Sequence, residues 1–262
     1  MPISGKEIFR TYDELGPIQV FDDGTKRYLS FGEGDEQSCV LKTEPYLLQH
    51  EYTRAMLLPF LFSQPRDALL VGLGGGALVN CLMHHFPELT LRVVELRHAV
   101  VKVARKYFEL PRLDRLTIIE QDIAEFLDEK SQDEKSLAET GHTKTDILFS
   151  DIYDAEGMAP QYFEPWYIEA CAAMLSDQGW LVLNCWDEHR GDHHTLHALT
   201  EHFAQVFTCT VSTGNWIIMA SKKYYDLDEA NLKTVAKEQS KLLGYSVAAM
   251  LNRLYQAHPQ GE

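Results

Sequence analysis

Hydrophobic residues in the middle of the chain alternate between two patterns. Short continuous apolar runs predict buried strands, whereas apolar residues at helical spacing predict helices. The predicted strands are residues 68–73, 90–96, 115–120, 146–151 and 179–186. The predicted helices are residues 77–86, 98–108, 123–129 and 166–175. Because continuous apolar strands that alternate with helices form parallel sheets covered on both faces, the pattern predicts an α/β domain.

The two ends of the chain follow other patterns. Residues 17–41 alternate short β-rich runs with Asp-Gly and Gly-Glu-Gly turns, which is typical of a small antiparallel meander. Apolar spacing over residues 44–62 predicts a helix that joins this lobe to the α/β domain. Near the C-terminus we expect a hairpin over residues 208–222 and then helix over 228–256, interrupted near Gly244. We therefore divide the chain into an N-terminal β lobe (1–48) and a Rossmann-like domain (49–262), with residues 130–145 as a polar surface insertion.

The amino-acid composition indicates which binding partners and which cellular compartment to expect. With 39 Asp and Glu against 24 Lys and Arg, the chain has a formal charge of −15, which disfavours nucleic acid and favours a cationic partner. Its five cysteines form no CxxC pair and are expected to be reduced thiols. There is no signal-peptide pattern and no run near the roughly 20 apolar residues of a membrane span. We expect a cytoplasmic protein with no membrane partner.

A glycine-rich turn follows the first predicted strand, at Gly72, Gly74, Gly75 and Gly76. Such a turn lets the backbone approach a ligand and opens a helix N-terminus. Glu95 ends the second strand, about where an acid binds ribose hydroxyls in dinucleotide sites, roughly 20 residues after the glycines. These features predict an adenosine-containing ligand; the alternative is a structural glycine turn beside ordinary surface acids.

Acidic residues also follow the third and fourth predicted strands. Asp122 follows the third, and the fourth ends in "SDIYDAEG" (150–157), which contains Asp151 and Asp154. The glycine spacing GxGGGA differs from the dinucleotide pattern GxGxxG, so these acids suggest a ligand with ribose, adenine and a cationic sulfonium. A carboxylate at Asp151 would attract a cationic substrate and accept a proton from an attacking amine. The other reading of the two aspartates is ordinary turn chemistry.

Taken in order, several motifs resemble the spermidine synthase (polyamine aminopropyltransferase) family. They are "QS" (37–38), "EYTRAM" (51–56), "VGLGGGA" (71–77), "VVEL" (93–96), "QDI" (121–123), "SDIYDAEG" (150–157) and "LVLNCW" (181–186). The resemblance implies a small N-terminal β-hairpin lobe followed by a Rossmann-like class I methyltransferase fold with a mostly parallel seven-stranded sheet. It also implies a homodimer.

The resemblance assigns roles to individual residues. It implies that Glu95 binds ribose, that Asp122 binds adenine, and that Gln37 contacts the ligand near its sulfonium arm. It implies that Asp151 is the catalytic acid beside the attacking amine and that Asp154 holds a second amine. The donor would be decarboxylated S-adenosylmethionine or S-adenosylmethionine itself, and the acceptor a small-molecule amine such as putrescine.

The predicted linker helix and the glycine loop contain the other residues to which the resemblance assigns roles. They also contain the positions at which this sequence differs from the family's motifs. Tyr52 would stand in for the family's tyrosine and bind substrate, and Tyr153 would line the acceptor pocket or simply pack. Gly75 occupies the position of the Asp in the family's GGGDG loop, where that acid holds the donor's primary amine. Thr53 and Arg54 replace a His-Glu pair, and Arg54 would pair with the carboxylate of ordinary S-adenosylmethionine.

Three functions follow from these observations. The leading one is a transferase that moves an aminopropyl group to a polyamine. The first alternative is an S-adenosylmethionine-dependent methyltransferase on the same fold, and the second is a non-catalytic nucleoside-binding protein. Residues 189–202 hold five histidines, with His193 and His197 one helical turn apart, but there is no HExxH motif. We expect a solvated helix there and no metal site.

Overall fold

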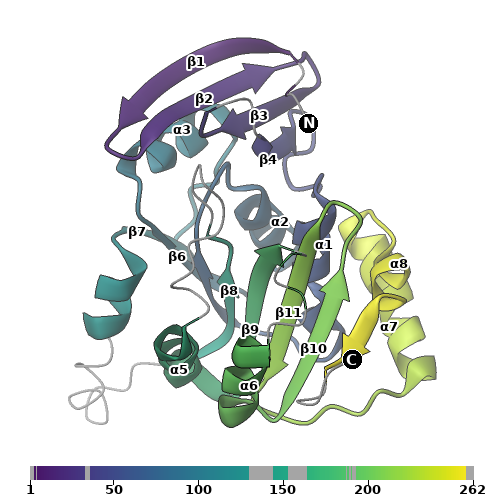
Figure 1. Cartoon of the computed structure of the whole chain (residues 1–262). Coiled ribbons are helices and arrows are strands. Elements are labelled where there is room, and N and C mark those ends of the chain that lie inside the picture. Colours follow the sequence, from purple (N-terminus) through teal and green to yellow (C-terminus); the bar gives the residue numbers. More distant parts are fainter. Residues whose placement is uncertain are drawn as a thin grey trace.

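The computed structural model describes residues 5–32, 36–129, 144–152, 164–186 and 193–257, together with residues 3, 188 and 190. The chain forms two sheets, a small one at the top of Figure 1 and a large one below it. The small sheet is an antiparallel meander of four strands, β1 (Lys6–Asp13), β2 (Gly16–Asp22), β3 (Lys26–Ser30) and β4 (Glu36–Leu41).

The large sheet has the strand order β12-β10-β11-β9-β8-β5-β6-β7. Its strands are β5 (Asp67–Val71), β6 (Thr90–Glu95), β7 (Leu116–Glu120), β8 (Thr145–Ser150), β9 (Leu175–Trp186), β10 (Gln205–Thr210), β11 (Asn215–Ser221) and β12 (Leu254–Gln256). Strands β5 to β9 pair in parallel, whereas β11, β10 and β12 pair antiparallel. This confirms the predicted class I methyltransferase fold, with β12 as an eighth strand where the sequence predicted helix.

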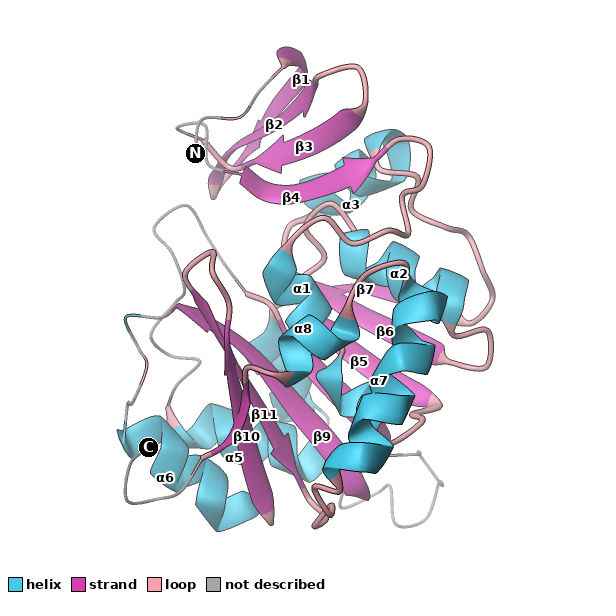
Figure 2. Cartoon of the chain, turned by 90° about the vertical axis from the view of Figure 1, so that its right-hand side faces the viewer, coloured by secondary structure: helices cyan, strands magenta, loops and turns pink. Residues whose placement is uncertain are grey.

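Helices cover both faces of the large sheet (Figure 2). They are α1 (Glu51–Met56), α2 (Ala77–His85), α3 (His98–Tyr107), α5 (Pro165–Met174), α6 (His193–His202), α7 (Glu229–Leu243) and α8 (Val247–Leu251), with a 3-10 turn η1 (Leu58–Leu61) and a further helix at 123–129. Alternate residues of β5 serve opposite layers, since Ala68 and Leu70 pack with the α2 and α7 side while Leu69 and Val71 pack with the α5 and α6 side. This alternation explains why the strand is apolar throughout.

The linker helix is shorter than predicted. A helix was expected over residues 44–62, but α1 begins only at Glu51 because His50 is extended, with φ −83° and ψ 140°. It ends at Met56, and the chain continues as the 3-10 turn η1, which contains Pro59. Proline lacks the N–H that would continue the α-helical bonding. None of the described helices combines the length and the apolar character needed to span a bilayer.

The small sheet is anchored on α3 and on the segment before it. Val100, Val103 and Phe108 pack against apolar residues of the small sheet. The guanidinium of Arg97 donates to the carboxylate of Asp13 at 2.7 and 2.9 Å and lies 4.6 Å from the centre of the Phe31 ring. These contacts hold the small sheet over the carboxyl ends of β5 and β6. The lobe boundary at residue 48 stays a prediction.

Gly72 allows β5 and β8 to approach each other where both strands end. The N–H of Asp151 donates to the carbonyl of Val71 at 2.9 Å, and the N–H of Gly72 donates to the carbonyl of Val94 at 2.9 Å. Gly72 has a φ of 90°, and a Cβ atom there would lie well under 3.0 Å from the carbonyl oxygen of Asp151. Only glycine fits this position without moving one of the two strands.

Gly72→Ala is therefore expected to lower the free energy of unfolding by about 3 kcal/mol or more, because it adds a backbone clash to an unfavourable φ. Gly24→Ala is the matched control: its φ is 97°, but nothing lies within 4 Å of the added Cβ. The control should lose about 1–2 kcal/mol from the backbone conformation alone. Chemical denaturation of both variants measures the difference, and equal losses would contradict the close approach.

Candidate functional site

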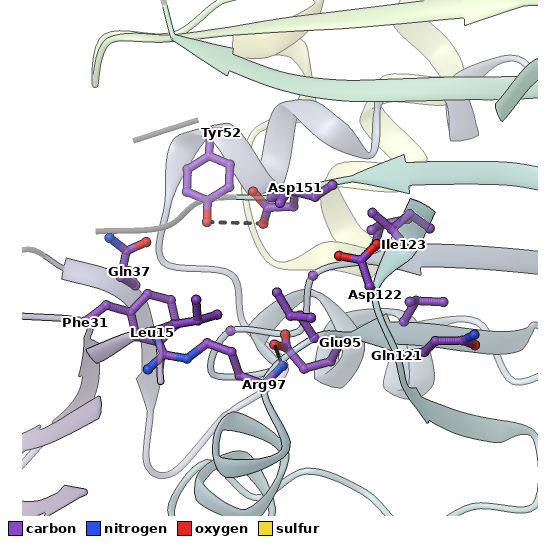
Figure 3. A pocket seen from close by; sticks show the side chains of 16 residues that line it. Leu15, Phe31, Gln37, Tyr52, Glu95, Arg97, Gln121, Asp122, Ile123 and Asp151 are labelled. Atoms are coloured by element: carbon purple, nitrogen blue, oxygen red, sulfur yellow. Dashed lines mark hydrogen bonds between the residues drawn. The ribbon is translucent and has the colours of Figure 1, made fainter. Parts of the chain in front are cut away.

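A pocket of about 240 Å³ opens at the carboxyl ends of the parallel strands (Figure 3). The large sheet contributes Glu95 at the end of β6, Asp122 after β7 and Asp151 after β8. Tyr52 enters from α1, and Gln37 enters from β4 of the small sheet. Three carboxyl groups, a phenol and a side-chain amide therefore meet at one pocket.

Glu95 is a buried carboxylate held by two backbone donors. Its Oε2 accepts from the N–H of Leu73 and its Oε1 from the N–H of Arg97, each at 2.8 Å. Burial raises the pKa of Glu95, and these backbone bonds oppose the rise. Each carboxylate oxygen has a second lone pair. Glu95 can thus hold the glycine turn and also accept hydrogen bonds from ribose hydroxyls.

Asp122 has a structural role beside its place in the pocket. Its Oδ1 accepts from the N–H of Ala124 at 2.7 Å and of Glu125 at 3.3 Å, so it caps the helix at 123–129. Both bonds go to one oxygen of the carboxylate. The other oxygen can accept from a ligand donor such as an adenine amino group.

Asp151 lies between an amide and a phenol. Its Oδ1 accepts from Nδ2 of Asn184 at 2.8 Å, and its Oδ2 lies 3.5 Å from the hydroxyl of Tyr52, the dashed contact at the upper centre of Figure 3. Burial raises the pKa of Asp151, while the bond from Asn184, the charge of His50 and the Tyr52 hydroxyl lower it. A carboxyl whose pKa is raised above its usual value is a stronger base, which suits a proton acceptor in a cleft.

Tyr52 is fixed by the residues on either side of it. The carboxylate of Glu51 accepts from the N–H and the hydroxyl of Ser212, and from the guanidinium of Arg253 at 2.6 Å. The ring of His50 stacks on that of Tyr52 with centroids 5.4 Å apart. The β10–β11 turn and the C-terminal region therefore hold the start of α1, and with it the phenol that faces Asp151.

The structure divides the four glycines of the loop into two pairs. Gly72 and Gly74 line the pocket. Gly75 and Gly76 do not belong to its lining, and a Cβ at Gly75 would lie 2.7 Å from Oγ of Ser38. Gly76, with a φ of 76°, is the N-cap residue directly before α2. The binding roles of Gly75 and Gly76 stay predictions, but close packing already accounts for both.

Arg54 was expected to pair with the carboxylate of S-adenosylmethionine, but neither Arg54 nor Thr53 belongs to the lining of the pocket. The guanidinium of Arg54 donates twice to the carbonyl of Leu48, at 3.0 and 2.7 Å, and lies over the ring of Tyr245. The hydroxyl of Thr53 donates to the carbonyl of His50 at 2.9 Å. Because successive residues of a helix point about 100° apart, Tyr52 can face the pocket only if these two side chains turn away.

Several predicted residues lie outside the described part of the chain. They are Tyr153 and Asp154 of the acceptor site and most of the 130–145 insertion. Within the described residues, no three His, Cys, Asp or Glu side chains come together as a metal site would require. On α6, Nε2 of the exposed His197 lies 3.6 Å from a carboxylate oxygen of Glu201 on the same helix.

The sequence reasoning missed residues that reach the pocket through tertiary contacts. Leu15, Phe31 and Arg97 line it, the first two from the small sheet. Nothing in the local pattern placed that sheet over Glu95. Asn184 carried a signal that was overlooked, since it is a polar residue inside the apolar run of β9 and its side chain is only 2% exposed. A buried amide needs a hydrogen-bond partner, and here the partner is Asp151.

The mostly parallel sheet, with the glycine turn and the acids at the ends of three of its strands, defines a domain of the class I methyltransferase fold. Residues 49–231 match the spermine/spermidine synthase domain, and the chain therefore belongs to that family.

Individual relatives agree with this membership. The chain is 28% identical over 254 residues to a polyamine aminopropyltransferase of Neisseria meningitidis, covering 92% of this chain and 90% of that protein. A probable spermidine synthase from Corynebacterium glutamicum has a similar structure, with a TM-score of 0.72, 19% identity and coverage of 99% and 92%. Human methyltransferase-like protein 13, solved in complex with SAH, has a TM-score of 0.63, 22% identity and coverage of 75% and 93%. Below 25% identity these two structures show the fold alone.

Replacing Glu95 by Gln tests the nucleoside site. We expect adenosine affinity to fall at least about tenfold, because the charged acceptor for the ribose hydroxyls is lost. Isothermal titration calorimetry with adenosine measures it. Glu120→Gln is the control, since Glu120 pairs with Glu95 in the sheet register but bonds to His98 and lies outside the pocket lining. Undiminished affinity in Glu95→Gln would show that the ribose binds elsewhere.

Proposed function

We propose that this protein transfers the aminopropyl group of decarboxylated S-adenosylmethionine to a small amine such as putrescine. The observation that carries the proposal is the partly buried carboxylate of Asp151, at the end of β8 between Tyr52 and Asn184. Family membership and the aminopropyltransferase relative support the same reaction.

The reaction needs few groups from the protein. The lone pair of the acceptor nitrogen attacks the carbon attached to the sulfonium, the carbon–sulfur bond breaks, and its electron pair stays on sulfur as a neutral thioether. The nitrogen then carries an extra proton, which passes to the Asp151 carboxylate. Proton acceptance of this kind contributes roughly a hundred- to ten-thousand-fold to the rate. Glu95 and Asp122 would hold the adenosine part while Gln37 lies near the sulfonium arm.

The charges around the pocket favour the decarboxylated donor. Among the described lining residues, Arg97 is the one cationic side chain, and its guanidinium is bound to Asp13 and to the carbonyl of Gly16. Arg54, the other candidate partner for a donor carboxylate, bonds to Leu48 instead. The donor's α-carboxylate would therefore enter a pocket whose side-chain charges are mainly acidic.

A methyltransferase on the same fold is the second candidate function, and Gly75 is the observation that favours it. Gly75 cannot supply the acid that holds the donor's amine in the family's glycine loop. Three further points stay predictions. They are the role of Asp154 and Tyr153 in binding the acceptor amine, the homodimer, and the cytoplasmic location.

Assays with both donors and putrescine separate these functions. We expect spermidine to form from decarboxylated S-adenosylmethionine, and no amine product from S-adenosylmethionine. Product detection by chromatography and mass spectrometry checks both reactions. Methylated putrescine would support the methyltransferase. Stabilisation of the fold by 5′-methylthioadenosine without any amine product from either donor would support the non-catalytic nucleoside-binding protein.

Asp151→Asn separates function from stability. We expect kcat to fall roughly a hundred- to ten-thousand-fold. Because burial raises the pKa of Asp151, wild-type stability is lost as pH rises through that pKa, when a buried carboxyl must give up its proton. Neutral Asn escapes this cost, so Tm at pH 7 should rise by about 2 °C or more. The gain should shrink as the pH falls through that raised pKa, because the wild-type carboxyl then takes up a proton. Thermal melts of wild type and Asp151→Asn across pH measure this difference. A lower Tm of Asp151→Asn than of wild type at pH 7 would show that the ionised carboxyl does not destabilise the fold.

A further inference from the structure

A directional chain of hydrogen bonds leads from the β10–β11 turn to Asp151. The hydroxyl of Thr213 donates to Oδ1 of Asn215 at 3.1 Å. Nδ2 of Asn215 donates to Oδ1 of Asn184 at 3.1 Å, and Nδ2 of Asn184 donates to Oδ1 of Asp151 at 2.8 Å. Each donor in the chain points toward the carboxylate.

This chain fixes which end of the Asn184 amide faces Asp151. A side-chain amide can present either its oxygen or its NH2 group, and the two choices have opposite effects on a carboxylate. Because Asn215 donates to the oxygen of Asn184, the NH2 group of Asn184 is directed at Asp151. Turning the amide over would face two donors against each other, which is costly for a residue that is 2% exposed.

We propose that Asn184 and Asn215 are positioning residues that make Oδ2 the proton-accepting oxygen of Asp151. Oδ1 already accepts the N–H of Asn184, so a proton on Oδ1 would oppose that donor. Oδ2 accepts from the Tyr52 hydroxyl at the longer distance of 3.5 Å, and a hydroxyl, unlike an NH2 group, can rotate to accept from a protonated oxygen. The inference rests on the proposed function in one respect: the proton that Oδ2 accepts comes from the attacking amine as its nitrogen bonds to carbon and the carbon–sulfur electron pair stays on sulfur.

Other charged and titratable groups face Asp151 from the surrounding elements. Glu95 ends β6 and Arg97 follows it, Asp122 follows β7, and His50 and Tyr52 lie at the start of α1. His50 also has a partner of its own, since its Nε2 lies 2.6 Å from Oε1 of Glu36. The two asparagines carry no charge, so they act on Asp151 through the direction of one hydrogen bond. A change at Asn215 therefore tests the chain without removing any of these charges.

The test is a ¹³C NMR titration of the Asp151 carboxyl carbon in the full chain, assigned by its loss in Asp151→Asn. In Asn215→Asp the new carboxylate accepts from Asn184, which must then turn its oxygen toward Asp151. We expect the Asp151 midpoint to rise by about one pH unit or more. Asn215→Ala removes the donor without adding charge and should also raise it, by less. Asn231→Asp adds the same charge on an exposed turn of α7 and should shift it by no more than about 0.3.

Two further measurements complete the test. In turnover assays, the acid limb of kcat/KM should move with the NMR midpoint in each variant. Calorimetry with 5′-methylthioadenosine should show wild-type affinity in Asn215→Ala. This control distinguishes a shifted Asp151 pKa from loss of the folded structure. An unchanged Asp151 midpoint in both Asn215 variants, or a shift in Asn215→Asp no larger than in Asn231→Asp, would overturn the inference. The titration needs no turnover, so a wild-type chain that makes no polyamine would contradict the proposed function separately.

Discussion

The close contact between Gly72 and the carbonyl of Asp151 is the constraint on which the site depends. It joins the ends of β5 and β8, so the glycine turn that lines the pocket and the carboxylate proposed as the proton acceptor belong to one junction. The same turn is tied to the next strand through Glu95, which accepts the N–H of Leu73. Backbone contacts therefore fix where Glu95 and Asp151 begin, and side-chain hydrogen bonds such as that from Asn184 orient the Asp151 carboxylate.

Two buried carboxyl groups in the site lower the stability of the folded protein when they are ionised. Burial raises the pKa of both Glu95 and Asp151, so each destabilises the fold when it is ionised. Backbone N–H groups offset part of this cost at Glu95, and the amide of Asn184 does so at Asp151. A cationic amine in the pocket would offset more of it. In the proposed reaction, this raised pKa makes Asp151 a stronger base than an exposed carboxylate.

Local patterns predicted the strands, the glycine turn and the acids at the strand ends, because the carboxyl ends of neighbouring parallel strands must meet. They could not place the small sheet, whose position depends on the contact between Arg97 and Asp13, far apart in the chain. They also gave Arg54 the wrong direction, since the start of α1 at Glu51 decides which residues of the helix face the pocket. The amides of Asn184 and Asn215 meet only when β9 and β11 pair, so their link to Asp151 required the structure.

The identity of the transferred group is the central claim, and a doubly labelled donor tests it most directly. Decarboxylated S-adenosylmethionine with ¹³C in its methyl group and deuterium in its aminopropyl group would be incubated with putrescine, and the products analysed by mass spectrometry. The account predicts deuterium in the amine product and ¹³C in the released thioether nucleoside. Transfer of ¹³C to the amine, with deuterium left on the nucleoside, would contradict it.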